Sequence, residues 1–345
     1  MKKQFMLLML LVAALQASAQ KWTKEKANAW YSKVAWGAGA DFLPATAINQ
    51  LEMWQKESFD PATINRDLGY AAGIGMTYMR VYLHHLAWEI DKEGFKDRIK
   101  QYLAIADKHK IKTIFVFFDD CWNNTYNAGT QPAPKPGIHN SGWVQDPGVV
   151  QVDHALLEAY VKDILTTFKS DKRILLWDLY NEPGNSKYGN KSMPLLQKVF
   201  SWGWAIRPDQ PLSVGVWKFD LKELSQYQLD NSDVITYHDY QTDKKHFKVI
   251  DSILAPRGLP IICTEYMART NDSRFENILP ELKKRKIIAI NWGLVAGKSN
   301  TIYAWNTPIK DGSEPPVWFH DIFRQDGTPY KPAETALIKS LTMGK

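Results

Sequence analysis

The sequence predicts a (β/α)8 TIM barrel, an α/β fold of eight parallel strands, each followed by a helix. Short runs rich in β-branched and aromatic residues alternate with segments of helical periodicity from about residue 34 onward. Eight such runs are present, and eight is the number of parallel strands that closes a barrel. An open, doubly wound sheet is the alternative, but no glycine-rich phosphate loop follows the first strand.

The predicted elements alternate regularly along the chain. Strands are expected at 34–39, 77–83, 112–118, 174–181, 211–216, 234–240, 260–266 and 287–294, and helical segments include 61–72, 94–109, 152–169 and 273–286. In segment 94–109 the apolar residues recur every three to four positions, as on one side of a helix. They are Phe95, Ile99, Tyr102, Leu103 and Ala106.

The first residues predict an export signal. Lys2 and Lys3 precede an apolar run at 5–15, and Ala17-Ser18-Ala19 offers a small-residue cleavage site. Residues 1–19 are therefore expected to be a signal peptide and 20–345 a single domain, secreted or periplasmic after cleavage near Ala19. No later apolar stretch is long enough for a membrane span, so no membrane insertion is expected.

The charge and the cysteine content argue against two further classes of protein, nucleic-acid-binding proteins and disulfide-rich scaffolds. The net charge of +6 is scattered without a basic stripe, so no nucleic-acid partner is expected. The two cysteines, Cys121 and Cys263, do not make a disulfide framework and are expected to be buried free thiols.

Two predicted strands each deliver a glutamate to their carboxyl end. The run 175–183 reads LLWDLYNEP, so an apolar strand ends in Asn181 and Glu182 before Pro183 interrupts the ladder. The run 260–266, PIICTEY, carries Glu265 in the same way. The fourth and seventh strands lie across the barrel mouth from each other, so the two carboxylates could flank a glycosidic bond.

On these motifs the chain resembles clan A of the glycoside hydrolases, and most of all the cellulase-type family 5. The resemblance follows the strands over nearly the whole chain after residue 19. It assigns the Asn-Glu-Pro glutamate, Glu182, as acid/base and the strand-seven Glu265 as nucleophile. It therefore implies a retaining β-glycosidase that hydrolyses β-linked plant or microbial glycans by double displacement.

The resemblance also implies a set of residues around the two glutamates. Arg80 on the second strand would hold Glu265 ionised, and Tyr240 could donate a hydrogen bond to the same carboxylate. Asn181 could bind the sugar 2-hydroxyl, and His238 could orient the substrate or tune Glu182. The family's strand-eight tryptophan is matched by Trp292.

One departure from the family pattern lies at the end of the third strand. The family commonly has a histidine there, whereas this chain has FFDDCW at 117–122. Asp119 and Asp120 are candidates to bind sugar hydroxyls in its place. His84 shares the strand parity of Arg80 and is therefore a further candidate substrate-binding residue, whereas the adjacent His85 would face the other way.

Tryptophans are numerous, and those in rim segments are candidate platforms for sugar rings because aromatic faces stack on apolar sugar faces. The candidates are Trp122, Trp143, Trp292 and Trp305, whereas Trp177 and Trp202 are expected in the core. Two long connections rich in proline and glycine, 119–150 and 295–328, follow strands three and eight. Two large insertions on one rim favour a partly closed pocket for short oligosaccharides or chain ends.

Two other functions fit the same fold. One is a barrel that binds carbohydrate without catalysis, and the presence of both glutamates with Arg80 and Tyr240 speaks against it. The other is a metal-dependent hydrolase, which should carry histidine pairs with metal spacing at strand ends. The sequence has no such pairs, so neither a metal nor a cofactor is expected, and the oligomeric state is left open.

Overall fold

The computed structural model describes residues 21–148 and 153–344. The predicted signal peptide lies outside these residues. Among the described residues, no helix combines the length and the apolar character that crossing a bilayer requires.

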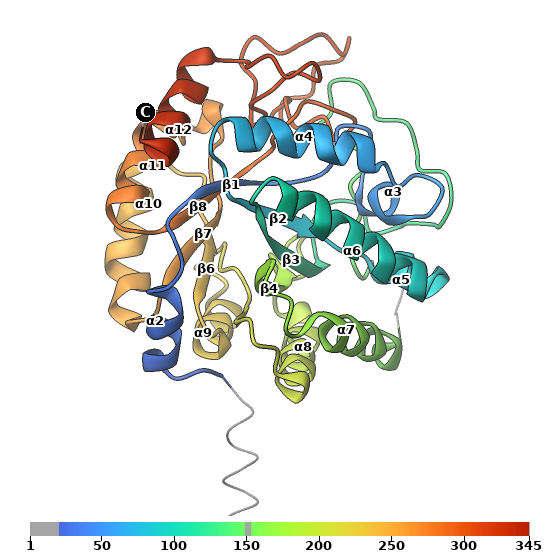
Figure 1. Cartoon of the computed structure of the whole chain (residues 1–345), viewed down its shortest axis with the longest axis vertical. Helices are drawn as coiled ribbons and strands as arrows, with labels where there is room; N and C mark the ends of the chain where they lie inside the picture. Colours follow the sequence, from blue (N-terminus) through green and yellow to red (C-terminus); the bar gives the residue numbers. More distant parts are fainter. Residues whose placement is uncertain (1–20, 149–152, 345) are drawn as a thin grey trace, which may run out of the picture.

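Eight parallel strands form the centre of the molecule (Figure 1). They are β1 (Ala38–Asp41), β2 (Tyr78–Tyr82), β3 (Lys112–Asp119), β4 (Ile174–Asn181), β5 (Leu212–Ser213), β6 (Ile235–His238), β7 (Ile261–Glu265) and β8 (Ile288–Trp292). The hydrogen-bonded order runs β5-β4-β3-β2-β1-β8-β7-β6. The predicted TIM barrel is therefore confirmed.

The seam between β5 and β6 is the weakest join of the barrel. No continuous ladder is formed there, but Val216 and Tyr237 make a parallel bridge. The amide of Val216 donates to the Thr236 carbonyl at 2.9 Å, and the amide of His238 donates to the Val216 carbonyl at 2.9 Å. These bonds complete the ring of strands, and they fix the backbone of His238 at the barrel mouth.

Helices surround the strands (Figure 1). They are α2 (Lys24–Tyr31), α3 (Gln50–Trp54), α4 (Pro61–Gly73), α5 (His85–Ile90), α6 (Lys92–Lys108), α7 (His154–Phe168), α8 (Met193–Ile206), α9 (Lys222–Asn231), α10 (Asp243–Val249), α11 (Phe275–Lys284) and α12 (Pro332–Met343). Short 3₁₀ turns lie at Gly189–Ser192, Ala255–Arg257 and Arg269–Asn271, and a π turn at Ile250–Leu254.

Sequence signals at helix starts and on helix faces explain several of these bounds. The side chain of Asp60 caps α4, whose first residue is a proline, and Asp91 caps α6. The predicted apolar side of 94–109 is buried in α6. Burying this side against β3 and its neighbours stabilises the helix mainly through the hydrophobic effect.

Most strand predictions agree with the structure to within one or two residues, and the fourth strand agrees at both ends. The first strand is the main error, because β1 begins at Ala38 and not at residue 34. Both cysteines are free and buried, as expected. Trp177 and Trp202 are buried in the core, also as expected.

The two long loops lie against each other on the rim of the barrel. The loop after β3 and the loop after β8 are joined by backbone hydrogen bonds from Asn140 to the Ser299 carbonyl and from Ile309 to the Gly137 carbonyl, both 3.0 Å. The first loop also docks on α3, where the Gln50 amide donates to the Val144 carbonyl. These contacts place the loops over the β1 and β2 side of the mouth.

Candidate active site

Glu182 lies immediately beyond the carboxyl end of β4. Its φ angle is +46°, in the left-handed region that residues other than glycine rarely adopt. Pro183 follows and cannot donate a ladder hydrogen bond. The strained turn carries the carboxylate out of the strand and into the barrel mouth, where its side chain keeps 12% exposure. Strain of this kind is concentrated at functional sites.

Glu265 is the last residue of β7 and is almost fully buried. Oε1 lies 2.7 Å from Nη1 of Arg80 and accepts a hydrogen bond from the Tyr82 hydroxyl at 3.0 Å. Oε2 accepts a hydrogen bond from the Tyr240 hydroxyl at 2.6 Å. Three donors therefore converge on this carboxylate and hold it in place.

Arg80 connects four strands beneath the site. Its guanidinium contacts Asp41 from β1 at 2.8 Å and Asp178 from β4 at 2.7 Å, besides Glu265 from β7. Nη2 also donates to Oδ1 of Asn181 at 2.7 Å. The guanidinium thereby fixes the side chain of Asn181, the residue before Glu182, as well as Glu265.

His238 lies between the two glutamates at the end of β6. Its Nδ1 is 2.8 Å from Oε1 of Glu182 and 3.6 Å from Oε1 of Glu265. Burial lowers the pKa of His238 to about 4, so the imidazole is neutral at neutral pH. A neutral Nδ1 either donates to a Glu182 carboxylate or accepts from a Glu182 carboxylic acid, so the contact suits both protonation states of the glutamate.

The surroundings of Glu182 differ from those of Glu265. Burial raises the pKa of the Glu182 carboxyl, and hydrogen bonds from Asn185 and Cys121 and the charge of Arg80 offset part of that rise. The Asn185 amide donates to Oε2 at 2.5 Å, and the Cys121 thiol donates to the same oxygen at 3.4 Å. The two carboxyl groups are close, since an oxygen of Glu182 lies within 4.8 Å of an oxygen of Glu265.

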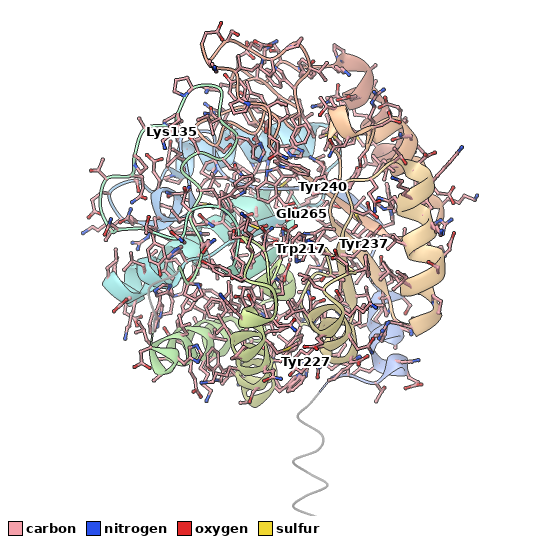
Figure 2. The ribbon with its side chains drawn as sticks, turned by 180° about the vertical axis from the view of Figure 1, so that it is seen from behind. Lys135, Trp217, Tyr227, Tyr237, Tyr240 and Glu265 are labelled. Carbon is pink, nitrogen blue, oxygen red and sulfur yellow. The ribbon has the colours of Figure 1, made fainter. Side chains whose placement is uncertain are left out.

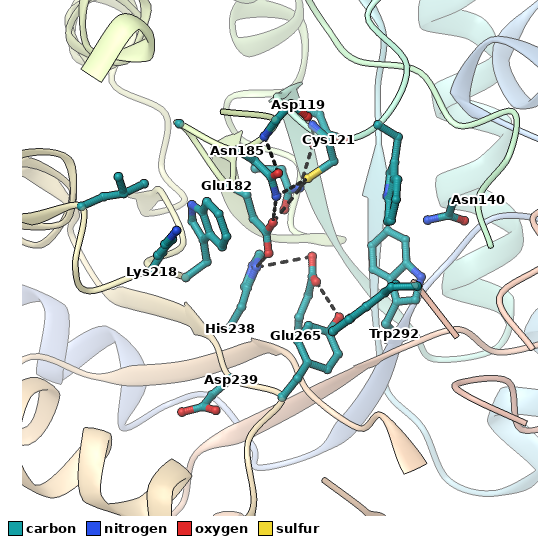
Figure 3. Close-up of a pocket in the computed structure, with 18 of the residues that line it drawn as sticks. Asp119, Cys121, Asn140, Glu182, Asn185, Lys218, His238, Asp239, Glu265 and Trp292 are labelled. Carbon is teal, nitrogen blue, oxygen red and sulfur yellow. Dashed lines mark hydrogen bonds and ion pairs between the residues drawn. The ribbon is translucent and has the colours of Figure 1, made fainter. Parts of the chain in front are cut away.

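Both glutamates open into one cavity of about 1150 Å³. Figure 2 shows Glu265, Tyr240 and Trp217 near the middle of the molecule, whereas Lys135 lies on the outlying loop. Figure 3 shows the residues around the two glutamates, with His238 bridging them. Of the residues predicted from the sequence, nine line the cavity: Glu182, Glu265, Asn181, His238, Tyr240, Trp292, Trp122, Trp305 and Asp119.

Four predicted site residues do not line this cavity, and one of them, Arg80, is buried beneath it in its pair with Glu265. His84 lies beyond the end of β2, where strand parity no longer applies, and it is the N-cap of α5 with its ring on the Gln145 carbonyl. Asp120 points to the loop after β4, accepting from Tyr180 and the Gly184 amide. Trp143 packs edge-on against Trp292 from behind, at 5.4 Å between ring centroids.

Asp119, the other member of the aspartate pair, does line the cavity. It accepts hydrogen bonds from the Asn181 amide at 2.8 Å and the Trp143 indole at 2.7 Å. It therefore lies beside Asn181 at the end of β3. Because Asp119 and Asp120 bind different partners, they do not form a joint metal site.

Sequence reasoning missed several cavity residues. Cys121 was expected as a plain buried thiol, although it adjoins the predicted strand-three residues and contacts Glu182. Asn185 follows the Asn-Glu-Pro motif by only two positions, and this short spacing could have indicated it. Trp217 and Asn140 lie in loops, and no sequence pattern distinguishes them from ordinary loop residues.

Two groups among the described residues bring three possible metal ligands together. One is Glu182, His238 and Glu265 itself. The other is His84, His85 and Asp146, outside the cavity, where His84 Nδ1 accepts from the Leu86 amide at 3.2 Å. In that second group His85 hydrogen bonds to Asp146 and Nε2 of His84 contacts the Gln145 carbonyl, so the polar atoms already have protein partners.

The fold and the site define a (β/α)8 barrel with two closely spaced glutamates on opposite strands. Comparison with solved structures finds the same fold among glycoside hydrolases. A GH5_18 enzyme from Bifidobacterium longum in complex with Manβ1-4GlcNAc aligns with a TM-score of 0.59 and 13% identity, over 90% of this chain and 78% of that one.

Two further structures extend the comparison. The endo-1,4-β-D-mannanase of Thermotoga petrophila aligns with a TM-score of 0.54 and 13% identity, over 90% of this chain and 99% of that one. A family 39 glycoside hydrolase of Bacteroides cellulosilyticus aligns with a TM-score of 0.54 and 16% identity, over 91% of this chain and 65% of that one. No protein-family model and no curated protein matches the sequence. The likeness is thus one of fold, a (β/α)8 barrel shared with these glycoside hydrolases.

Proposed function

We propose that the protein is a retaining β-glycosidase in which Glu265 is the nucleophile and Glu182 the acid/base. The observation that carries this proposal is the close approach of the two carboxyl groups, within 4.8 Å between their nearest oxygens. Retaining glycosidases hold their carboxyl groups about 5–5.5 Å apart, whereas inverting enzymes leave about 6.5–9.5 Å for a water molecule. The spacing supports double displacement.

The different surroundings of the two glutamates support the assignment of roles. Glu265 faces Arg80, Tyr82 and Tyr240, which together favour a charged carboxylate ready to attack the anomeric carbon. Burial raises the pKa of Glu182, which favours the protonated carboxyl that can donate to the glycosidic oxygen. After the leaving group departs, Glu182 would take a proton from the water that releases the sugar from Glu265.

Asn181 and Trp292 would position the sugar ring at the reacting centre. The Asn181 amide is held by Arg80 and Asp119, so it is preorganised to bind the sugar 2-hydroxyl, a contact that strengthens in the transition state. Trp292 would stack on the ring. Trp122 and Trp305 line the same cavity and offer further aromatic surface.

The substrate is proposed to be a β-linked oligosaccharide, and the protein is proposed to act outside the cytoplasm after loss of residues 1–19. The solved structures with the same barrel include mannanases and a complex with Manβ1-4GlcNAc. Aryl β-mannosides and β-linked manno-oligosaccharides are therefore the first substrates to test, followed by the gluco and xylo series.

Variants of the two glutamates test the proposal on aryl β-glycosides. Glu265→Gln should abolish turnover of every substrate, because no other group can form the glycosyl-enzyme. Glu182→Ala should retain most activity on aryl glycosides with good leaving groups, and added azide should yield a β-glycosyl azide. Glu158→Gln, on the exposed face of α7, is the matched control and should behave as wild type. Near-normal hydrolysis of oligosaccharides by both site variants would disprove the assignment.

A further inference from the structure

The proposed roles of the two glutamates fix the direction in which a sugar chain must lie. This direction rests on the proposed function. An acid that protonates the glycosidic oxygen stands on the side of the leaving group, whereas the ring under attack lies over the nucleophile. In Figure 3, Lys218 lies beyond Glu182 on one side, and Trp292 and Asn140 lie beyond Glu265 on the other. The non-reducing part of a substrate therefore points to Trp292 and Asn140.

The cavity is closed on that side. Its lining residues come from the ends of β3 to β8 and their loops, and none of the described residues that follow β1 or β2 contributes. Beyond Trp292 lies a small void of about 20 Å³, lined by Tyr82, Trp143 and Ser299 among others. Such a void has room for a water molecule but not for a sugar ring. Asn140 and Trp292 line both spaces and so form the partition between them.

The closing wall is tied together by its own hydrogen bonds. The backbone amide of Trp143 donates to the backbone carbonyl of Asn140 at 3.0 Å. The backbone amide of Asn140 in turn donates to the backbone carbonyl of Ser299 in the other loop. The Asn300 side chain donates to the Lys135 carbonyl at 2.9 Å, and Nδ1 of His139 lies 2.8 Å from the Tyr303 carbonyl. Contacts of this kind along both loops make the wall a fixed part of the cavity.

Asn140 has an unused binding group at this closed end. The residue is only 1% exposed, yet neither atom of its side-chain amide has a hydrogen-bond partner among the described residues. Leaving a buried amide without partners is unfavourable, and a ligand that supplies them removes that cost. A primary amide offers one acceptor and two donors, which match neighbouring hydroxyls of a sugar ring.

The opposite side of the cavity is open. Lys187 and Lys218 lie beyond Glu182, and both are exposed. Trp217, in the segment between β5 and α9, is half-buried, and its indole donates to the Pro183 carbonyl. All three line the cavity. A leaving group of any length can therefore extend past Glu182 into solvent.

We propose that the enzyme acts at non-reducing chain ends, with the terminal sugar held against Asn140 and the rest of the chain leaving past Trp217. The closed wall limits the released unit to a fixed mono- or disaccharide. Internal cleavage would require the chain to continue through the wall of Asn140, Trp143 and Trp292, which leaves no space for it.

A hexasaccharide labelled with 2-aminobenzamide at its reducing end tests the direction and the mode of attack. The hexasaccharide should be built from the sugar whose aryl β-glycoside the enzyme hydrolyses. We expect one unlabelled short product of fixed size from the start, and a labelled series that shortens by that unit. A 4-O-methyl cap on the non-reducing end should abolish cleavage.

Other product patterns contradict the proposal in distinguishable ways. Labelled fragments of several lengths appearing together early, or unimpaired cleavage of the capped chain, would overturn chain-end action while leaving the glycosidase assignment intact. A short labelled product formed first would show attack from the reducing end and would also overturn it. Failure to hydrolyse every aryl glycoside and oligosaccharide would refute the proposed function and this inference with it.

The contribution of Asn140 is tested with Asn140→Gly, because glycine accepts its left-handed φ of +46° and removes the side chain with its amide. We expect KM for a trisaccharide to rise about tenfold, because the loss of one hydrogen bond weakens binding by about that factor. The value of kcat should be much less affected. Asn127→Gly, an exposed position of the same loop, should leave both constants unchanged. Asn140→Asp, with unfolding temperature as a folding check, is the second variant. Unchanged KM in both folded variants at position 140 would overturn the role of the amide.

Discussion

Arg80 and Glu265 form an ion pair of 2.7 Å between β2 and β7, with the guanidinium fully buried and the carboxylate nearly so. The same guanidinium contacts Asp41 and Asp178. One cation thus serves three acidic side chains of the barrel interior. Because its partners come from three other strands, the charge network that supports the proposed nucleophile also joins the strands to one another.

Replacing Arg80 should therefore destabilise the protein. Arg80→Met leaves Asp41, Asp178 and Glu265 without a cation, and removing one partner of a buried ion pair typically costs about 3–5 kcal/mol. We expect the free energy of unfolding to fall by about that amount, measured by urea denaturation. Arg257→Met, which breaks the exposed pair with Asp230, should cost about 1 kcal/mol or less. Equal losses in the two variants would refute a special role of the buried network.

The alkaline limb of the pH profile should depend on Asn185. The acid must be protonated to act, so activity falls as the pH rises through the raised pKa of Glu182. The Asn185 amide favours the charged carboxylate and so lowers that pKa. Asn185→Ala should therefore move the alkaline limb of kcat/KM to higher pH. The measurement needs an aryl glycoside with a poor leaving group.

A matched asparagine serves as the control for this shift. Asn190→Ala removes an exposed contact to Glu223 and should leave the limb in place. An alkaline limb that stays unchanged or moves to lower pH in Asn185→Ala would contradict either the hydrogen bond or the role of Glu182 as the acid.

Both the fold and the pair of glutamates could be predicted because each rests on local patterns. Apolar runs ending in Asn181-Glu182 and in Glu265 mark strand ends, and parallel strands of a barrel bring their carboxyl ends to one face. The prediction for His84 was wrong because it extended such a strand pattern beyond the end of the strand. Alternation of side chains holds only within a strand, and β2 ends at Tyr82.

The shape of the cavity could not be predicted from such patterns. Whether Trp143 faces a ligand or packs behind Trp292 depends on how two loops meet that are more than 150 residues apart in the chain. The unpaired amide of Asn140 is likewise set by the docking of these loops. Irregular loops carry no periodic signal, so their contacts appear only in three dimensions.

Removal of metal ions should leave activity unchanged. The proposed mechanism needs only two carboxyl groups, and in the group of His84, His85 and Asp146 both ring nitrogens of His84 are engaged by protein partners. Prolonged dialysis against EDTA should therefore give the same kcat/KM as dialysis against buffer alone. Activity lost on chelation and restored by one particular metal would contradict the metal-free mechanism.

The two long loops dock against each other at Gly137. Its φ is +71°, and a Cβ atom at this position would lie 1.8 Å from the Ile309 carbonyl oxygen of the opposite loop. Gly137→Ala must therefore push the loops apart, besides straining the backbone. We expect a lower unfolding temperature and a higher KM for oligosaccharides, since the wall that holds the terminal sugar is displaced. A small aryl glycoside, bound mainly at the reacting centre, should keep most of its kcat.

Gly129 provides the control that separates strain from docking. It belongs to the same loop and has a φ of +88°, but a Cβ atom there would meet nothing within 4 Å. Gly129→Ala therefore carries only the cost of a left-handed backbone, about 1–3 kcal/mol. The difference between the two variants measures what the contact of the loops contributes to stability and to oligosaccharide binding. If Gly137→Ala and Gly129→Ala changed the unfolding temperature and KM equally, the docked loops would not form the wall of the binding site.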